Sequence, residues 1–129
     1  MRRRQTSEKA GRFAESLAAI YLQIYGYKII SRRAKTPFGE IDIMARKRDM
    51  IIFAEVKYRR NKSDLETSLH PSAQKRIIKA ADYITSRTPE IQPYQQRFDL
   101  ILMAPLLSIS LFTLPWGYMR HLKDAWRAY

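Results

Sequence analysis

Two short segments near the middle of the sequence, residues 39–42 and 53–57, constrain this chain more than any other feature. Each is typical of a β-strand, and a short charged turn separates them, so together they predict a hairpin. Successive side chains of a strand point to opposite faces, which puts Glu55 and Lys57 on one face. Pairing of the two strands would bring Asp42 close to them. Two carboxylates and an ammonium group would then meet at one place on a sheet.

Hard divalent cations such as Mg²⁺ bind carboxylate oxygens, and a nearby lysine can stabilise charge on a phosphate under attack. The constellation therefore suggests a nuclease. The pattern also fits a solvated strand end, on which Glu55 and Lys57 form salt bridges with cross-strand neighbours. Residues 50–58 are apolar on both faces until Glu55, however, which predicts a central strand covered on both sides. Charges at the end of such a strand need an ion partner or a cleft, because burying them unpaired is costly.

The remaining patterns predict a single α/β domain over residues 7–129, preceded by a disordered basic tail at residues 1–6. One helix begins at Ser7 and ends before Gly26, and a second begins at Pro71 and is ended by Thr88-Pro89. Strands are expected at residues 27–32, 40–45, 50–58, 97–103 and 107–114, and a final short helix at residues 118–128. The expected order is α-β-β-β-α-β-β-α, with a mixed central sheet flanked by helices.

Composition limits the partners and the compartment. The chain has 24 Lys and Arg against 12 Asp and Glu, a formal net charge of +12, which favours an anionic partner such as nucleic acid. There is no cysteine, which excludes disulfides and thiolate metal sites. The longest apolar stretch, residues 106–116, is too short for a membrane-spanning helix. We expect a cytoplasmic protein without stable membrane insertion. A peripheral interaction with an acidic membrane would rest only on charge and on this stretch, which could also be a partner surface.

Several residues outside the hairpin could contribute to a site. Glu15 borders the apolar stripe of the first helix and could reach the sheet edge, although an ordinary flanking charge is favoured for this residue considered by itself. Glu40 shares the face of Asp42, with Ile41 and Ile43 expected on the opposite face. Asp99 is expected near a strand end, and His70 and His121 are interpreted as structural or surface residues. Tyr58, Phe38 and Tyr94 could stack on unpaired bases, with core packing favoured for Phe38.

Basic residues cluster on both sides of the hairpin segments and on the second helix. If they converge on one cleft, they form a track for phosphates, whereas a solvated charged face is the plainer interpretation. The residues predicted to bind nucleic acid are Arg46, Lys47, Arg48, Arg59, Arg60, Gln74, Lys75 and Arg76.

The ordered set of motifs resembles the YraN-like family of small bacterial proteins over residues 8–128. These motifs are Gly11-Arg12-Phe13-Ala14-Glu15, Gly26-Tyr27, Gly39-Glu40-Ile41-Asp42, Phe53-Ala54-Glu55-Val56-Lys57-Tyr58-Arg59 and Arg97-Phe98-Asp99. That family is placed in the restriction-endonuclease-like, PD-(D/E)XK superfamily and is similar to archaeal Holliday junction resolvases. The resemblance implies a restriction-endonuclease-like core.

The resemblance also implies roles for individual residues. Asp42 and Glu55 match metal ligands, Lys57 matches the catalytic lysine, and Glu15 matches a helix-borne acid that assists the metal site. Gln74 corresponds to a polar residue on the following helix. Where many relatives carry an Arg-Asn pair after the first strand, this chain has Arg33-Ala34.

Taken together, the residues and the resemblance predict a nuclease that hydrolyses DNA, with branched or single-stranded DNA as candidate substrates. Asp42, Glu55 and the Val56 carbonyl are expected to hold Mg²⁺ or Mn²⁺, with Glu15 holding a metal-bound water or a second ion. Lys57 is expected to orient the water or stabilise the developing charge. The alternative is a nucleic-acid-binding module of the same fold that does not cut. A homodimer is compatible with either hypothesis.

Overall fold

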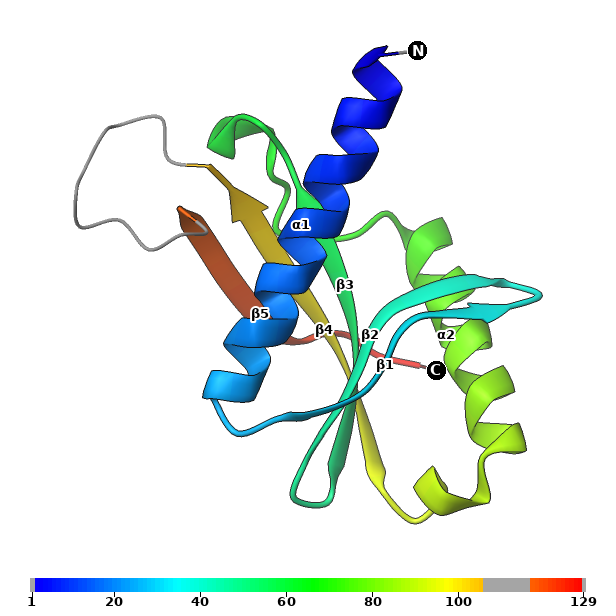
Figure 1. Cartoon of the computed structure of the whole chain (residues 1–129). Coiled ribbons are helices and arrows are strands. Elements are labelled where there is room, and N and C mark those ends of the chain that lie inside the picture. The colour runs from blue at the N-terminus through cyan, green and yellow to red at the C-terminus, as the bar shows by residue number, and fades with distance from the viewer. Residues whose placement is uncertain (1, 106–116, 129) are drawn as a thin grey trace.

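A computed structural model of the chain describes residues 2–105 and 117–128, with side chains from Lys9 onward. Figure 1 shows two long helices on either side of a twisted sheet. The described elements are α1 (Arg2–Ile24), β1 (Lys28–Thr36), β2 (Gly39–Lys47), β3 (Met50–Tyr58), η1 (Lys62–Asp64), α2 (Pro71–Arg87), η2 (Pro89–Ile91), β4 (Gln95–Ala104) and β5 (Tyr118–Trp126).

The sheet of the described residues has five strands in the order β1-β2-β3-β4-β5. Neighbouring strands are antiparallel except for β3 and β4, which are parallel and are joined through α2. β3 is therefore the central strand, and its residues 51–54 are at most 1% exposed. This confirms the mixed α/β sheet and the central, doubly covered strand, and the arrangement is consistent with a restriction-endonuclease-like core.

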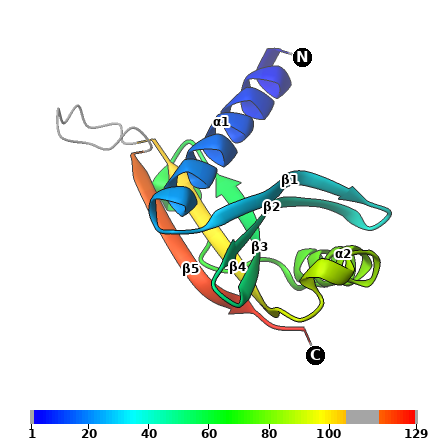
Figure 2. The ribbon, with the colours of Figure 1, turned by 60° about the horizontal axis from the view of Figure 1, so that its bottom comes forward.

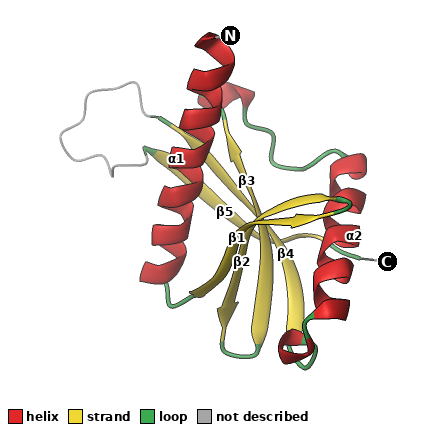
Figure 3. Ribbon diagram, turned by 45° about the vertical axis from the view of Figure 1, so that its right-hand side comes forward, coloured by secondary structure: helices red, strands yellow, loops and turns green. Residues whose placement is uncertain are grey.

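The sheet carries one helix on each face (Figure 2, Figure 3). α1 covers one face of the sheet, where it packs against Ala54 of β3 and Ile101 of β4. α2 covers the opposite face, where it packs against Phe53 of β3 and Leu100 of β4. Side chains of a strand alternate between its two faces, and the central strands are apolar on both. Each face therefore needs a helix packed on it, because leaving the apolar side chains of either face in water would lose the free energy of burying them. None of the helices among the described residues combines the length and apolar character needed to cross a bilayer.

The first two predicted elements differ at their ends from those in the structure. α1 begins at Arg2 and so includes residues 2–6, which the sequence predicts to be a disordered tail. Arginine and glutamine are good helix formers, and the segment holds no glycine or proline to stop the helix. β1 continues to Thr36 instead of ending near residue 32, because it pairs with β2 as far as the turn at Gly39.

The predicted final helix at residues 118–128 is wrong: this segment is the strand β5, antiparallel to β4. The spacing of Met119, Leu122 and Trp126 suits a helix, but β4 is buried along most of its length. A helix here would leave the outer edge of a buried strand without hydrogen-bond partners. The predicted strand at residues 107–114 lies outside the described residues.

The expectation that Ile41 and Ile43 share a face is also wrong. Ile41 packs in the cluster against α2, whereas Ile43 packs in the cluster against α1. The β1–β2 hairpin leaves the plane of the sheet between these residues and extends alongside α2 (Figure 3). Arg33, on the neighbouring strand, has a positive φ of 53° at this level. The strict alternation of a flat strand does not hold across such a distortion.

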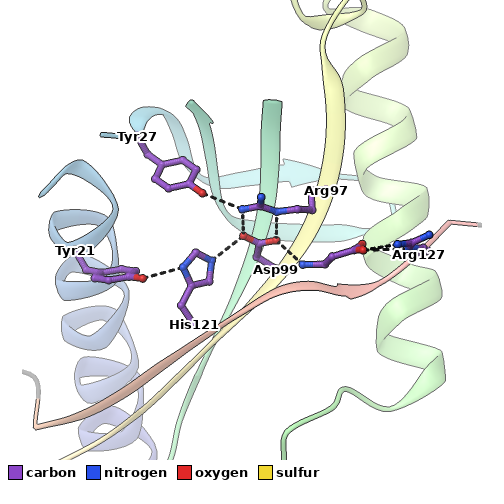
Figure 4. A network of polar contacts seen from close by, with 7 residues as sticks. Tyr21, Tyr27, Arg97, Asp99, His121 and Arg127 are labelled. Atoms are coloured by element: carbon purple, nitrogen blue, oxygen red, sulfur yellow. Dashed lines mark hydrogen bonds and ion pairs between the residues drawn. The ribbon is translucent and has the colours of Figure 1, made fainter. Parts of the chain in front are cut away.

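A buried polar network joins α1, the connection between α1 and β1, β4 and β5 (Figure 4). Its centre is Asp99, which is 0% exposed. Arg97 forms a bidentate ion pair with Asp99, and both N···O distances are 2.8 Å. His121 Nε2 lies 2.7 Å from Asp99 Oδ2, and its Nδ1 lies 2.9 Å from the Tyr21 hydroxyl. Arg97 also donates to the Tyr27 hydroxyl at 2.9 Å. The network ties the first helix to the last strand, as expected for a structural histidine at position 121.

Candidate functional site

The candidate site begins where β2 separates from β3, at Asp42. Backbone pairing between the two strands ends at Ile43 opposite Ala54, and the part of β2 before Asp42 pairs with β1. The carboxyl group of Asp42 enters the opening, where its Oδ2 accepts a hydrogen bond of 2.8 Å from the Val56 N–H. The Asp42 carboxylate thus accepts a hydrogen bond from a main-chain N–H of β3 that pairing with β2 leaves free. This hydrogen bond fixes the carboxylate beside the end of β3.

Glu55 lies beside Asp42 in this opening, close enough for each carboxyl group to shift the pKa of the other. Burial, followed by the negative charge of Asp42, raises the pKa of Glu55 to about 8. Burial also raises the pKa of Asp42, although the hydrogen bond from Val56 N–H works in the opposite direction. With its pKa raised to about 8, Glu55 keeps a proton at neutral pH, and a bound cation could replace that proton.

Arg76 of α2 reaches the pair from the other side. Its Nη2 lies 3.9 Å from Glu55 Oε1, and its Nη1 donates to the Glu40 carbonyl at 3.3 Å. A Cβ placed on Gly39 would come within 2.7 Å of Arg76 Nη1, so the missing side chain at Gly39 leaves room for the guanidinium. Arg76 therefore spans from the β1–β2 hairpin to the carboxyl pair. Besides burial, the negative charge of Glu40 makes a minor contribution to the raised pKa of Asp42.

Glu15 approaches the pair from α1 and is buried against β1. Its Oε1 lies 3.2 Å from Arg33 Nε and 3.7 Å from Arg32 Nη2. Burial and then the charge of Asp42 raise the pKa of Glu15, and the two arginines partly oppose this rise. Glu15 is thus within electrostatic reach of Asp42, as predicted, but arginines that the sequence reasoning did not assign to the site hold its carboxylate.

Lys57 follows Glu55 on the same face of β3, with its side chain 14% exposed. Its ammonium nitrogen lies 3.8 Å from Glu66 Oε2 in the loop before α2, and Glu66 is itself 79% exposed. Such an exposed ion pair contributes little free energy and is easily exchanged for a phosphate oxygen. Lys57 is therefore adjacent to the carboxyl pair and available to a ligand, although its partner here is a loop carboxylate and not a cross-strand neighbour.

The predicted nucleic-acid-binding residues separate into two groups. Arg46, Lys47 and Arg48 lie at the closed end of the β2–β3 hairpin, about 15 Å along the strand from Asp42. Arg46 packs over Tyr94 and Lys47 over Tyr27, so both have structural contacts. The second group lies after β3 and on α2 and consists of Arg59, Arg60, Gln74, Lys75 and Arg76. Arg76 is the member of this group that contacts the carboxyl pair. Within it, Gln74 donates to the Leu69 carbonyl and so helps to fix the loop before α2.

The donor set can be compared with what a divalent cation needs. No group of three or more His, Cys, Asp or Glu residues suited to holding a metal ion occurs in the described part of the chain. Mg²⁺ is commonly held by one or two carboxylates together with waters and substrate phosphates, so the Asp42–Glu55 pair fits this cation as a partial site. The chain has no cysteine, and both ring nitrogens of His121 already contact Asp99 and Tyr21, which leaves oxygen ligands for the cation. The role of the Val56 carbonyl stays a prediction.

Some contacts of the site were missed at the level of sequence. The sequence singles out Arg33 only as part of the Arg33-Ala34 departure from relatives and does not single out Arg32, yet both side chains contact Glu15. Arg33 does so from a backbone position with a positive φ of 53°. The ion pair between Arg97 and Asp99 could have been found, because residues two apart on a strand point to the same face.

Comparison with known proteins assigns the chain to a family. The model of the uncharacterised protein family UPF0102 matches residues 14–103. A UPF0102 protein of Rhodopseudomonas palustris (strain BisB5) is 45% identical over 97 residues, covering 75% of this chain and 74% of the relative. A UPF0102 protein of Paramagnetospirillum magneticum is 36% identical over 130 residues, covering 98% and 93%. The matched family segment includes the carboxyl pair, Lys57 and Arg76. The chain therefore belongs to the UPF0102, or YraN-like, family.

Proposed function

We propose that this protein is a metal-dependent nuclease that hydrolyses DNA phosphodiester bonds. The observation that supports this most strongly is the meeting of Asp42 and Glu55 in the opening between β2 and β3, with the pKa of Glu55 raised to about 8. Carboxyl groups with raised pKa values, close together and beside basic side chains, are typical of functional sites. A purely structural pair would be stabilised by more donors than one main-chain N–H.

Each residue has a distinct task in this proposal. Asp42 and Glu55 hold Mg²⁺ or Mn²⁺, which when bound polarises the scissile phosphate and lowers the pKa of the attacking water. Lys57 leaves Glu66 and orients that water or stabilises the charge on the phosphate oxygens. Arg76 binds a non-bridging phosphate oxygen once the cation neutralises Glu55. Glu15, held by Arg33, orients a water at the edge of the site. The water oxygen bonds to phosphorus and gives up a proton to solvent, the bond to the leaving deoxyribose oxygen breaks, and that oxygen takes a proton from solvent.

The test is a cleavage assay on single-stranded, duplex and four-way-junction DNA with Mg²⁺, Mn²⁺ or EDTA. Asp42→Asn and Lys57→Ala should each lower the metal-dependent rate at least about 100-fold, since each removes a group proposed to act in the transition state. Asp64→Asn, an exposed aspartate in η1, is the matched control and should cut like the parent protein. Cutting that survives both site substitutions would indicate contamination by another nuclease.

Binding without cutting is the outcome that would reject the enzyme. If the parent protein binds these DNAs but cuts none of them with either metal, the site is that of a nucleic-acid-binding module. Asp42→Asn would then bind DNA more tightly than the parent protein, because it removes a carboxylate near the phosphates.

A further inference from the structure

The turn between β1 and β2 carries an aromatic side chain that the fold does not bury. Phe38 is 45% exposed, contrary to the core packing favoured from the sequence. Its ring makes an edge contact with Tyr83 of α2, with 6.3 Å between ring centroids, and Arg87 lies over the Tyr83 ring at 3.9 Å. Exposing a large apolar ring costs free energy that a protein recovers when the ring meets a ligand.

The turn that presents Phe38 is held rigidly. The Thr36 hydroxyl donates to the Gly39 carbonyl at 2.7 Å and accepts the Phe38 N–H at 3.0 Å. Pro37 restricts the backbone before Phe38, and Gly39 adopts a positive φ of 124°. The ring is therefore presented in one position, so binding a flat partner would cost little conformational entropy.

The hairpin end lies close to the candidate site and among basic side chains. Phe38 lies in the turn directly before β2, four residues before Asp42, a reach of at most about 13 Å, or roughly four nucleotides of stacked DNA. Arg76 joins the two places, because it contacts the Glu40 carbonyl on the hairpin and Glu55 in the site. Figure 2 and Figure 3 both show the hairpin end beside α2. Exposed Lys35 and Lys79 add positive charge on these two elements.

From this arrangement we propose that Phe38 is a stacking platform for an unpaired DNA base. From Phe38 the chain runs directly into β2, which carries Asp42 of the carboxyl pair. The inference rests on the proposed function only for the nearby cleavage; base stacking itself does not require cutting. It narrows the substrate to DNA with unpaired bases within about four nucleotides of the scissile phosphate, since a base inside an intact duplex has no free face.

The test measures binding in EDTA, where no metal-dependent cutting occurs. Anisotropy of a labelled single-stranded oligonucleotide should show that Phe38→Ala weakens binding about 5- to 100-fold, the loss expected for one stacked base. Phe38→Tyr should restore the affinity because it keeps the ring, whereas Phe38→Leu should not. Phe13→Ala is the matched control: Phe13 is 62% exposed, on α1, and its loss should leave binding unchanged.

A second readout reports the stacking directly. An oligonucleotide with 2-aminopurine should lose fluorescence on binding the parent protein and Phe38→Tyr, and lose much less on binding Phe38→Ala. Equal affinity and equal quenching for Phe38→Ala, with folding verified by circular dichroism, would overturn the inference even if the protein cuts DNA. Weaker binding by Phe38→Ala in a protein that cuts nothing would keep the inference and reject the nuclease. A parent protein that binds no single-stranded DNA would overturn it.

Discussion

Asp99 and the Asp42–Glu55 pair are acidic groups buried in the same sheet, yet their pKa values move in opposite directions. Burial alone would raise the pKa of Asp99, but hydrogen bonds from His121, Arg97 and the Asp124 N–H outweigh it and lower the pKa. The pair in the β2–β3 opening has one main-chain donor and an arginine at 3.9 Å, and burial raises both pKa values. The first acid is fully satisfied by the fold. The carboxyl pair has fewer donors than Asp99, which is consistent with the proposed cation site.

Asp99→Asn should give the largest loss of stability in the molecule. It removes the charge that pairs with Arg97 and His121, and breaking a buried pair in this way costs about 3–5 kcal/mol. Urea unfolding followed by circular dichroism measures the change. Asp82→Asn, an exposed aspartate on α2, is the control and should lie within about 0.5 kcal/mol of the parent protein. A loss below about 1 kcal/mol at Asp99 would show that the network is not structural.

Glu55→Gln should raise the free energy of unfolding at alkaline pH, whereas Asp99→Asn lowers it. Between the ordinary pKa of 4.5 and the folded value of about 8, the folded protein keeps a proton that the unfolded chain has lost. The free energy of unfolding therefore falls as pH rises through this range in the parent protein. At pH 9, Glu55→Gln should be more stable than the parent by on the order of 2 kcal/mol. The measurement is urea unfolding in metal-free buffer at pH 5, 7 and 9.

At acidic pH the free energy of unfolding depends on Asp99 instead of Glu55. The lowered pKa of Asp99 contributes stability above its ordinary value that is lost as pH falls through the lower, folded value. Glu55→Gln should keep this acid limb unchanged and lose only the decline toward alkaline pH. If the free energy of unfolding of Glu55→Gln fell toward alkaline pH as steeply as that of the parent, groups other than Glu55 would cause the fall.

Mg²⁺ should offset the alkaline loss in the parent protein. A cation that binds only the folded state at ten times its dissociation constant adds about 1.4 kcal/mol to the free energy of unfolding. Thermal unfolding at pH 8 with and without MgCl₂ should show this rise in the parent and not in Glu55→Gln. NaCl at matched ionic strength controls for screening of the net charge. An equal rise in both proteins would exclude the pair as the cation site.

Tyr21→Phe should give the smallest effect. It removes the hydroxyl that meets His121 Nδ1 at the end of the Asp99 network, while the ion pair between Arg97 and Asp99 remains. The expected loss is about 1 kcal/mol in urea unfolding. Tyr25, which is 60% exposed and directly follows α1, is the control, and Tyr25→Phe should change stability less. If the two substitutions cost the same, the Tyr21 hydroxyl adds nothing to the network.

Much of the fold could be predicted because strong local signals agree with the tertiary structure. The bounds predicted for β3, residues 50–58, are those of the structure, since a long apolar run between two turns allows little else. β5 was missed because apolar residues at positions 119, 122 and 126 suit a helix, and only the open edge of β4 decides for a strand. Helical periodicity over so short a segment is weaker than the demand of a buried edge for partners.

For the site, the sequence alone determined that acids and a lysine follow one another on neighbouring strands, because side-chain alternation and hairpin pairing are local. It also determined the positive charge that favours a polyanion, and it indicated the family. Only the tertiary structure decided that Asp42 enters the opening beside Val56, that Arg76 reaches Glu55, and that Phe38 stays exposed. It also decided which acids are satisfied and which are not. That depends on burial and on the number of donors around each carboxylate, which are supplied by elements far apart in the chain.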